Sequence, residues 1–470
     1  MTVSCFAKAG SHGVPIFMLE DGALAGWLKK APETARAWVR GQGFTAAPAS
    51  HLAVPDATGN VAAVLFGTPR DELAGPWPYA ALAEALPAGR YAFASGLPDG
   101  QADMAALGWA LGHYRFARYR STAAGDMKKP RRLVLPAGCD DAAVARAYDA
   151  IALVRDLVNT PAADMGPAAL AAAVRTVARA HGARVAVTTG KNLLTANLPA
   201  IHAVGRAAAA APRLIDMRWG KAGAPRLTLV GKGVCFDTGG LDIKPASAMR
   251  LMKKDMGGAA HALALAQMVM AARLPVRLRL LIPAVENSVA GNALRPGDVI
   301  ATRKGLSVEI GNTDAEGRVV LCDALALADE ETPDLLLDFA TLTGAARIAL
   351  GPDLPALFTP DDALAAALED AGRRLADPLW RLPLWRPYAD MLKSPIADLC
   401  NISQDGFAGA ITAALYLDRF VTRARAWAHI DLFAWNPQTR PGRPKGGEAM
   451  GLRAAFAVIA QRYRNTGNGA

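Results

Sequence analysis

The sequence predicts an α/β layered fold whose sheet is largely parallel. The chain has 470 residues, which exceeds one ordinary domain and predicts two. Hydrophobic residues make up 52% of the chain and charged residues 20%, a composition that can build a sizeable core. From about residue 140 onward, apolar strand-like runs alternate with helix-like segments, which is the pattern of strands joined by helices.

The predicted elements follow one another in a regular order. Apolar residues from Val144 to Val158 recur at helical spacing, and the Asn-Thr-Pro that follows ends this helix. A second helix begins at Pro167 and stops near Gly182, because proline favours the first helical turn and glycine the position after the last. The remaining apolar runs predict strands at 183–189, 225–233, 276–285, 333–342 and 427–435, and helices at 257–273 and 318–330.

The chain divides into two parts. Residues 1 to about 135 are rich in Ala, Pro and Trp and contain no obvious motif. The segment GDMKKPRRLVLPAGCDD, residues 125–141, mixes turn residues with basic charge, as a boundary between domains does. We therefore predict two domains, at 1–138 and 139–470.

The sequence argues against a secreted or membrane protein. The N-terminal MTVSCFAKAGSHG has no basic region followed by an apolar block, and no apolar run approaches the ~18 residues of a membrane span. The five cysteines are scattered without a CxxC pair, which argues against a disulfide framework. We expect a protein of the reducing cytoplasm with no membrane partner. The net charge of +10 permits an acidic partner without requiring one.

Charged residues that could do chemistry lie in glycine-rich segments after apolar strands. LVGKGVCFDTGG, residues 229–240, supplies Lys232 and Asp237, and its glycines let the backbone approach a bound group closely. The spacing GxxxxGK[ST] of a phosphate loop is absent there. Farther along come Lys244 and Asp255, the latter before two glycines and a predicted helix. Ligands collect at the carboxyl ends of strands in such sheets, so a site is expected here.

The stretch GNTDAEGR, residues 311–318, adds Asp314, Glu316 and Arg318. Residues two apart share a face in an extended segment, so these three side chains would point the same way. Val319 onward fits a helix, which puts Arg318 at a helix N-terminus. Free amides and the helix dipole at such an end suit a bound anion.

Each of these residues also has a simpler interpretation. The acidic residues of GNTDAEGR could be solvated, Asp237 and Asp255 could be helix N-caps, and the two lysines could be surface charges. His261 is expected to be a packed helix residue. None of the seven histidines forms an HExxH pair, which argues against a histidine-based zinc site. Ser247 and Ser288 have no His and Asp partners for a serine triad.

The joint occurrence of four carboxylates and two lysines favours a two-metal site. Four carboxylates can hold two divalent cations when some of them bridge, and two cations ~3.5–4 Å apart polarise a substrate oxygen and deprotonate a shared water. A lysine buried beside dications would lose its proton and could then be a nitrogen ligand. A second lysine that keeps its charge could stabilise an oxyanion.

These motifs resemble the leucyl aminopeptidase family, the cytosolic dimetal aminopeptidases, of bacterial type. GNTDAEGR matches the hallmark segment of that family, and GKGVCFDTGG, the IKP after it and MKKDMGGAA match in order and spacing. Further matching blocks are RDLVNTPAADMGP (155–167), ATLTGA (340–345), ADLCN to GAITAA (397–414) and WAHID (427–431). The resemblance covers roughly residues 150 to 455. It implies a smaller, variable N-terminal α/β domain and a larger catalytic domain whose central mixed, mostly parallel sheet is flanked by helices.

The resemblance implies a role for each matched carboxylate. Lys232, Asp237, Asp255 and Glu316 would hold a tightly bound metal ion. Asp237, Asp314 and Glu316 would hold a more exchangeable one, so that two of the carboxylates bridge. The expected cofactors are two divalent ions per subunit, zinc or manganese, with magnesium and cobalt as alternatives.

Further residues match the family's catalytic and substrate-binding positions. Lys244 would contact the substrate carbonyl oxygen and the gem-diolate, and Arg318 would hold a bicarbonate ion that acts as general base. The pocket for the first side chain would be lined by Met252, Thr341, Gly344 and Ala449. The segment AMGLRAA, 449–455, borders that pocket and departs from the family's usual TGRP.

The resemblance implies a metal-dependent aminopeptidase that releases N-terminal residues, leucine and other apolar residues among them, from peptides. A metal-bridging hydroxide would attack the scissile carbonyl. Coordination of the free α-amine to the exchangeable metal would limit cleavage to the first residue. The family forms hexamers, so we expect a homohexamer that acts on peptide substrates.

Three alternatives come from other functional classes. The basic segments KKPRR (128–132) and RPGRPK (440–445) could bind DNA, as some family members do, but we expect them to be solvated linker and loop. A site of four carboxylates could instead serve phosphoester hydrolysis. An inactive homologue is disfavoured because all the ligands are retained. Salt-sensitive retention on DNA and a phosphomonoesterase assay would separate these alternatives.

Overall fold

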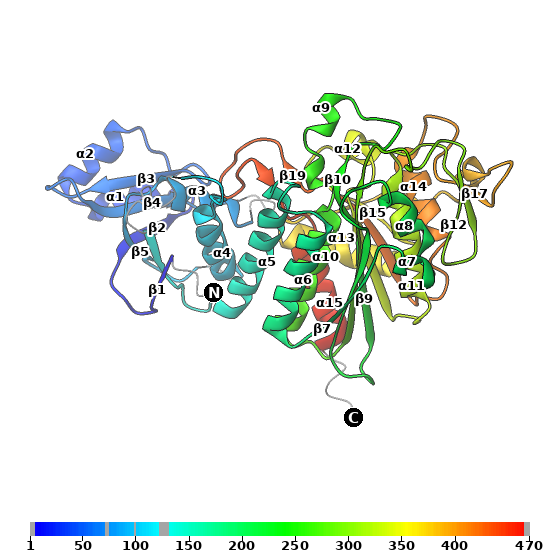
Figure 1. The fold of residues 1–470 in the computed structure, drawn as a ribbon. Helices are drawn as coiled ribbons and strands as arrows, with labels where there is room; N and C mark the ends of the chain where they lie inside the picture. Colours follow the sequence, from blue (N-terminus) through cyan, green and yellow to red (C-terminus); the bar gives the residue numbers. More distant parts are fainter. Residues whose placement is uncertain (1–4, 71–74, 98–99, 122–130, 465–470) are drawn as a thin grey trace. The chain divides into compact units, whose positions relative to one another are not determined.

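The chain folds into two compact α/β units. The computed structural model describes all residues except 1–4, 71–74, 98–99, 122–130 and 465–470 (Figure 1). The first unit comprises Met1–Asp149 and Gln438–Lys445, and the second comprises Ala150–Pro437 and Gly446–Ala470. Strands and helices build both units, so the predicted α/β class is confirmed. The predicted domain boundary at residue 138 stays a prediction.

The first unit is built on a six-stranded sheet. Its elements are β1 (Phe6–Ala7), β2 (Val14–Leu19), α1 (Ala23–Lys30), α2 (Glu33–Gly41), β3 (His51–Pro55), β4 (Val61–Gly67), α3 (Trp77–Ala85), β5 (Gly89–Phe93), α4 (Gln101–His113) and β6 (Arg131–Val134). The strand order is β1-β6-β5-β2-β4-β3, and only the β3–β4 pairing of this path is antiparallel. In β4, Leu65 packs with α1 and α2, whereas Val64 and Phe66 pack with α3 and α4. Alternating side chains thus give this sheet two covered faces.

The second unit contains the central sheet on which the candidate site is built. Helix α5 (Asp141–Asn159) begins in the first unit and ends in the second. The strands of the large sheet are β7 (Arg184–Thr189), β8 (Arg213–Trp219), β9 (Arg226–Gly231), β10 (Gly233–Asp237), β11 (Arg277–Asn287), β14 (Leu335–Ala340), β15 (Ala356–Phe358), β16 (Trp380–Arg381) and β18 (Trp427–Asp431). Smaller sheets are formed by β12 (Val299–Ala301), β13 (Ser307–Glu309) and β17 (Leu399–Cys400), and by β19 (Trp435–Asn436) and β20 (Gly446–Gly447).

Helices connect and cover these strands. They are α6 (Pro167–His181), α7 (Asn192–Thr195), α8 (Pro199–Gly205), α9 (Ala246–Met249), η2 (Met252–Lys254), α10 (Gly257–Ala271), α11 (Glu316–Asp329), α12 (Gly344–Leu350), α13 (Asp362–Arg374), η3 (Arg386–Leu392), α14 (Gly409–Asp418) and α15 (Leu452–Arg464). Among the described residues, no helix is both long enough and apolar enough to cross a membrane.

The large sheet is mixed and mostly parallel, as predicted. Its strand order is β16-β15-β18-β14-β9-β11-β8-β7, and β10 pairs with β11 beyond the end of β9. Five of the strand pairings are parallel and three are antiparallel. The antiparallel pairings lie toward the two edges, so the carboxyl ends of the central strands β9, β14 and β18 meet at one edge of the sheet.

Helices cover both faces of this sheet (Figure 1). In β14, Leu337 and Phe339 pack in the cluster that includes α6, α10 and α15. Leu336 and Ala340 pack in the opposite cluster, which includes α8, α11 and α14. All six residues of β14 are buried, as expected of a parallel strand covered on both faces. A buried ion pair, between Arg155 Nη2 and Glu448 Oε1 at 3.0 Å, lies in the same unit.

Two strands end earlier in the structure than the sequence predicts. The strand predicted at 225–233 ends at Gly231, and the chain continues as β10 after Lys232, whose carbonyl accepts the N–H of Ala259 in α10 at 2.8 Å. The strand predicted at 427–435 ends at Asp431, and Ala434, with a φ of 53°, separates it from β19. Both interruptions lie at the candidate site.

Candidate metal centre and active site

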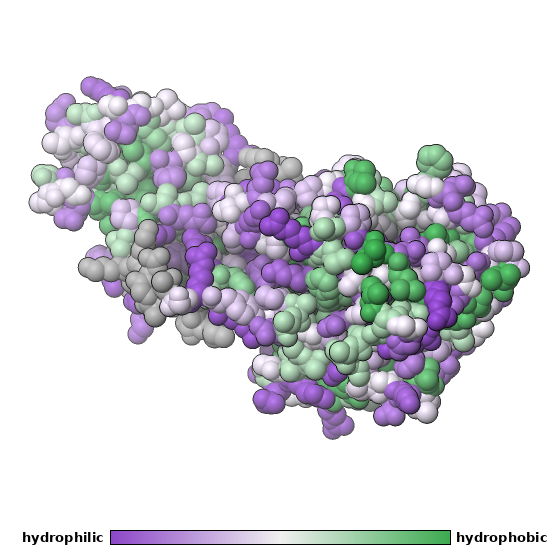
Figure 2. Space-filling model, turned by 45° about the horizontal axis from the view of Figure 1, so that its top comes forward, coloured by the Kyte–Doolittle hydropathy of each residue, from purple (hydrophilic) through white to green (hydrophobic). Residues whose placement is uncertain are grey.

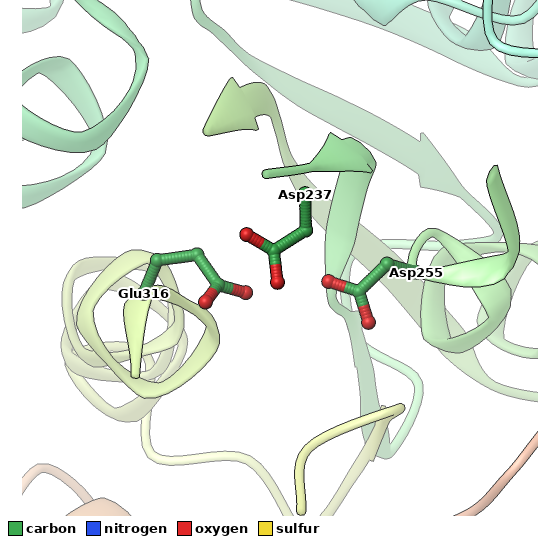
Figure 3. Close-up of side chains that lie close together, drawn as sticks. All are labelled: Asp237, Asp255 and Glu316. Atoms are coloured by element: carbon green, nitrogen blue, oxygen red, sulfur yellow. The ribbon is translucent and has the colours of Figure 1, made fainter. Parts of the chain in front are cut away.

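The site lies where strands of the large sheet end and two helices begin. Lys232 separates β9 from β10, and Asp237 is the last residue of β10. Asp255 stands between η2 and α10, and Glu316 is the first residue of α11. Figure 3 shows the carboxylates of Asp237, Asp255 and Glu316 gathered together, and one oxygen of each lies within 4.8 Å of the other two.

Close backbone packing brings these segments together. A Cβ on Gly258, near the start of α10, would lie 2.1 Å from the Phe339 carbonyl oxygen, and a Cβ on Gly231 would lie 2.6 Å from the Ala259 Cα. Only glycine lets α10 approach β9 and β14 this closely. The start of α10 therefore holds Asp255 beside Lys232, which follows β9.

Lys232 is buried at the centre of the cluster. Its Nζ lies 2.8 Å from Asp255 Oδ2 and 2.8 Å from Glu316 Oε1, and it donates to the Thr341 carbonyl at 2.9 Å. Burial alone would lower the pKa of Lys232, but the charges of Asp255 and Glu316 outweigh burial and raise it. A Cβ on Gly317 would lie 2.6 Å from the lysine Nζ, so a larger residue there would displace the end of the lysine side chain. The loss of the Lys232 ammonium proton on metal binding stays a prediction.

Lys244 pairs with two further carboxylates. Its Nζ lies 2.8 Å from Asp237 Oδ2 and also contacts Asp314, whose side chain is 33% exposed. Burial and the charge of Asp237 raise the pKa of Asp314 to about 6. A tight turn places the lysine: its N–H bonds to the Thr238 carbonyl at 2.9 Å, and Gly239 has a φ of +89°. The structure therefore brings both predicted lysines to the predicted carboxylates.

Two neutral side chains orient these carboxylates. Asn287 Nδ2 donates to Asp237 Oδ1 at 2.9 Å and to the Thr313 carbonyl at 3.1 Å. Thr341 Oγ1 donates to Asp255 Oδ1 at 2.8 Å. Sequence reasoning missed Asn287, although it ends a buried apolar strand as Asp237 does. Hydrogen-bonded partners of this kind fix the direction in which a ligand oxygen points.

Arg318 lies buried in the first turn of α11, which confirms the prediction that it stands at a helix N-terminus. Its Nη1 donates to the Asn401 carbonyl at 2.7 Å, and its buried Nε has no hydrogen-bond partner among the described residues. Asn401 Oδ1 accepts the N–H groups of Gly311 and Asn312 at 2.7 and 3.2 Å, which anchors the GNTDAEGR stretch. Sequence reasoning assigned Asn401 no role, although it lies in one of the matched blocks. A buried donor without a partner marks a place for an anion.

The extended arrangement predicted for Asp314, Glu316 and Arg318 is wrong. Asp314 lies in a turn, and the other two lie in the first turn of α11. Asn312 Oδ1 accepts the N–H of Asp314 at 2.7 Å, and this Asx turn directs the chain into the helix before Arg318. Helical residues two apart do not share a face, so the side chains of Glu316 and Arg318 point in different directions.

The simpler interpretations of the site residues are mostly wrong. Asp237 ends a strand and Asp255 precedes α10 without capping it, so neither is a helix N-cap. Glu316 is 2% exposed, so it is no solvated loop carboxylate. His261 is a packed helix residue, as predicted: it is fully buried, and its Nε2 accepts the N–H of Met450 at 2.9 Å.

The chemistry of the cluster fits divalent cations. Four carboxylates face two lysines, so negative charge is in excess even when both lysines are protonated. Asp255 Oδ2, Asp314 Oδ1 and Glu316 Oε1 are buried and, in the described part of the chain, accept no well-directed hydrogen bond, although a lysine Nζ lies close to each. Burial and the charge of Asp237 raise the pKa of Glu316 well above its usual value. Crowded oxygen donors that lack partners suit hard divalent cations.

A cavity of about 440 Å³ opens beside the cluster. Three of the four residues predicted to hold the first side chain of a substrate line it, namely Met252, Thr341 and Gly344. Ala449 is not among the lining residues. It is half-buried against the hydrophobic core, and its N–H donates to Glu448 Oε1 at 3.0 Å. The role of Ala449 in holding the first side chain stays a prediction.

Two cations that the sequence analysis did not single out line the same cavity. Lys254 Nζ and Arg347 Cζ each lie 5.0 Å from the centre of the Phe433 ring. Lys254 is 5% exposed, and burial lowers its pKa to about 8. The only sequence signal was the second lysine of MKKD, directly before Asp255.

Two arginines of the basic segments considered for DNA binding pack locally within the first unit. Residues 128–130 lie outside the described residues. Arg131 Nη1 donates to the Ala83 carbonyl at 2.6 Å, and the Arg443 guanidinium lies 5.0 Å from the centre of the Trp77 ring. These two arginines therefore contribute to local packing, and DNA binding is not proposed.

Comparison with protein families decides the assignment. The model of the cytosol aminopeptidase family, catalytic domain, matches residues 152–456, and that of the M17 aminopeptidase N-terminal domain matches residues 14–136. The chain belongs to the cytosol aminopeptidase family. Members of this family are metallo-exopeptidases that depend on two metal ions, so the chain is a metal-dependent aminopeptidase.

Individual cytosol aminopeptidases resemble the chain over most of its length. A probable cytosol aminopeptidase of Geobacter sp. (strain M21) is 40% identical over 383 residues, which cover 78% of this chain and 77% of that protein. One from Mycobacterium bovis is 37% identical over 444 residues, covering 88% and 85%. The crystal structure of a cytosol aminopeptidase from Coxiella burnetii has 50% identity and a TM-score of 0.91, covering 98% of this chain and 100% of that chain. The bottromycin maturation enzyme BotP, in complex with Mn, has 35% identity and a TM-score of 0.85, covering 95% and 99%.

Proposed function

We propose that this aminopeptidase binds one metal ion through Lys232, Asp237, Asp255 and Glu316 and a second through Asp237, Asp314 and Glu316. The observation that carries the proposal is the cluster in which oxygens of Asp237, Asp255 and Glu316 lie within 4.8 Å of one another. When bound, the two ions supply an activated water and polarise the scissile carbonyl. The remaining chemistry falls to side chains around the cavity.

Lys244 is proposed to stabilise the oxyanion that forms at the scissile carbonyl. Its side chain is 12% exposed and lines the cavity, so the ammonium can reach a bound peptide. A preorganised charged donor of this kind strengthens as negative charge develops in the transition state. Lys244→Met is expected to lower kcat by roughly 100-fold, the loss typical of one oxyanion donor, while metal content is retained. An unchanged kcat would contradict this role.

Arg318 is proposed to hold a bicarbonate ion that acts as general base. Its buried Nε, which lacks a hydrogen-bond partner in the described part of the chain, supports an anion there. Held by Arg318, a bicarbonate ion would supply a general base and acid for proton transfer between the attacking water and the leaving amine. Activity of protein prepared without carbonate should rise on bicarbonate addition, and Arg318→Met should abolish that rise.

We propose peptides with leucine and other apolar N-terminal residues as substrates, and zinc or manganese as the ions. The apolar groups of Leu251, Met252 and Leu354 in the cavity lining support such substrates. The presence of Mn in the BotP complex supports manganese as a candidate. The names of the curated relatives support a cytoplasmic location.

A homohexamer is proposed as the working assembly. The second unit exposes several large apolar side chains that assembly would cover: Ile348, Trp380, Trp385, Ile396 and Phe407. On the face seen in Figure 2, apolar residues gather in small groups among hydrophilic ones. Covering exposed apolar side chains in an interface is favourable, because it removes apolar surface from water. Light scattering during gel filtration measures the assembly, and a monomeric mass at micromolar concentration would contradict it.

One experiment tests the catalytic proposal as a whole. Metal-depleted protein is assayed on a panel of aminoacyl-p-nitroanilides, and zinc or manganese is then added back. Release of nitroaniline is expected only after metal addition, and Leu-p-nitroanilide is expected among the good substrates. The absence of metal-dependent release from every amide would overturn the proposal.

A further inference from the structure

The cavity beside the metal centre has two cations that the proposed mechanism does not use. Lys254 and Arg347 both line the cavity and flank the ring of Phe433, each at 5.0 Å from its centre. Among the described residues, no carboxylate lies within ion-pair distance of either cation. Lys254 is 5% exposed, so its ammonium is largely shielded from water.

The nearby carboxylates are occupied by other donors. Asp431 accepts the N–H groups of Leu342 and Thr343 through Oδ1, at 2.9 and 3.2 Å, and the Thr343 hydroxyl through Oδ2, at 2.6 Å. Asp255 pairs with Lys232 at the metal centre at 2.8 Å. Neither carboxylate can turn toward the cations without losing these contacts.

The ring of Phe433 attracts the two cations but does not neutralise them. An aromatic face interacts with a cation through its quadrupole and carries no net charge. Two like charges beside one ring therefore leave a local excess of positive charge, which calls for an anion. An arginine with free N–H groups is well suited to a carboxylate, because its fork matches the two oxygens.

We propose that Lys254 and Arg347 form a carboxylate-binding wall of the substrate pocket. This inference rests on the proposed aminopeptidase function and names an additional substrate class for it. The carboxylate can come from the side chain of an N-terminal Glu or Asp or from the C-terminus of a very short peptide. The side chain of the first residue is the favoured source, because Lys254 follows Met252 in the same short helix, and Arg347 lies one turn after Gly344 in α12.

The first arm of the test compares substrates that differ in charge but not in size. Glu-p-nitroanilide and Gln-p-nitroanilide both lack a C-terminal carboxylate, so their difference reports on the side chain alone. We expect kcat/KM to favour the Glu substrate by roughly ten- to a hundredfold, the effect of one or two charge-assisted hydrogen bonds. The second arm compares Leu-Gly with Leu-Gly-amide, and a preference for the free acid only here would assign the wall to the peptide C-terminus.

Variants test whether the two cations cause the preference. Arg347→Gln and Lys254→Met should each reduce the ratio of Glu to Gln turnover, whereas Arg347→Lys should retain most of it. Arg347→Glu should reverse the preference and favour Lys-p-nitroanilide. Arg373→Gln removes the same charge at a site on α13 that is 70% exposed, and it should leave the ratio unchanged. Because both substrates are measured with the same variant, a general loss of activity does not change the ratio of their kcat/KM values.

The outcomes separate this inference from the proposed function. If Leu-p-nitroanilide is cleaved but neither arm shows a preference for the carboxylate, the wall is refuted and the aminopeptidase stands. If no amide is cleaved, calorimetric titration of glutamate and glutamine into manganese-loaded protein compares their binding without turnover. Tighter binding of glutamate that is lost in Arg347→Gln supports the wall, and equal or absent binding overturns it.

Discussion

Glu316→Gln is the sharpest test of the metal centre, because the change keeps the shape of the side chain and removes one of three clustered carboxylates. Loss of an outer-shell partner already weakens metal binding 10- to 100-fold, so loss of a ligand is expected to cost at least ~100-fold. Metal at ~1,000 times its Kd stabilises the wild type by ~4.1 kcal/mol. A Kd that is ~100-fold higher reduces this to ~1.4 kcal/mol, a loss of ~2.7 kcal/mol.

This loss converts into a measurable change in melting temperature. The second unit has roughly 310 residues, so its entropy of unfolding is about 0.65 kcal/mol/K and the loss corresponds to about 4 °C. The assay is thermal melting with and without manganese, together with elemental analysis of the metal content. The metal-induced rise of each protein is measured against its own metal-free form, because the substitution also removes one of the two carboxylates that pair with Lys232.

The control is Glu330→Gln, the same substitution at the other end of α11, where the carboxylate pairs with Arg303 away from the cluster. It should retain the metal-induced rise in melting temperature. If Glu316→Gln binds metal with wild-type stoichiometry and shows the full rise, the bridging role is refuted.

Three further changes test other parts of the structure. Gly317→Ala would place a Cβ 2.6 Å from the Lys232 ammonium, and the displaced lysine should lower kcat at saturating metal by roughly 100-fold. Glu448→Gln removes the charge that pairs with the buried Arg155 guanidinium at 3.0 Å, and urea unfolding should show a loss of about 3–5 kcal/mol in the free energy of unfolding. Burial alone would lower the pKa of His429, but Asp338 outweighs it and raises the pKa. The wild type should therefore exceed Asp338→Asn in stability most clearly below the usual histidine pKa of 6.5, and this advantage should shrink as pH rises through the raised pKa.

Each of these predictions has a control and a contradicting result. For Gly317→Ala, the exposed Gly291→Ala adds a methyl where the structure has open space, and equal kcat values in the two variants would contradict the packing argument. For Glu448→Gln, a midpoint of urea unfolding equal to that of the wild type would show that the buried pair contributes nothing. For Asp338→Asn, an advantage that grows with pH would show that the histidine is neutral in the fold.

The sequence predicts the order of the elements better than their arrangement. Strands such as β11 and β14 are recognisable because long apolar runs lie between turn residues. Strand β8, RLIDMRW, was not predicted, because charged residues interrupt its pattern and its antiparallel pairing with β11 depends on the tertiary fold. The interruption between β9 and β10 likewise depends on the tertiary fold, because the carbonyl of Lys232 accepts the N–H of Ala259 in α10.

In the candidate site, the sequence predicts the charged residues better than the neutral residues that orient them. The charged groups Lys232, Asp237 and Asp255 could be singled out because charge directly after an apolar strand is unusual. Asn287 and Asn401 could not, because an amide carries no charge and acts here only through partners in distant segments. Sequence position also says little about which wall of a cavity a residue lines.

The arrangement of the two lysines explains how so many carboxylates can be buried together. Lys232 lies between Asp255 and Glu316, and Lys244 lies between Asp237 and Asp314, so each ammonium bridges two carboxylates as a divalent ion would. Isolated carboxylates in a low-dielectric interior would be strongly destabilising. The lysines compensate for part of this cost before any metal binds, which lets the protein fold first and bind its ions afterwards. The remaining negative charge is then the driving force for metal binding, and the rigid glycine-packed backbone holds the oxygens in place for it.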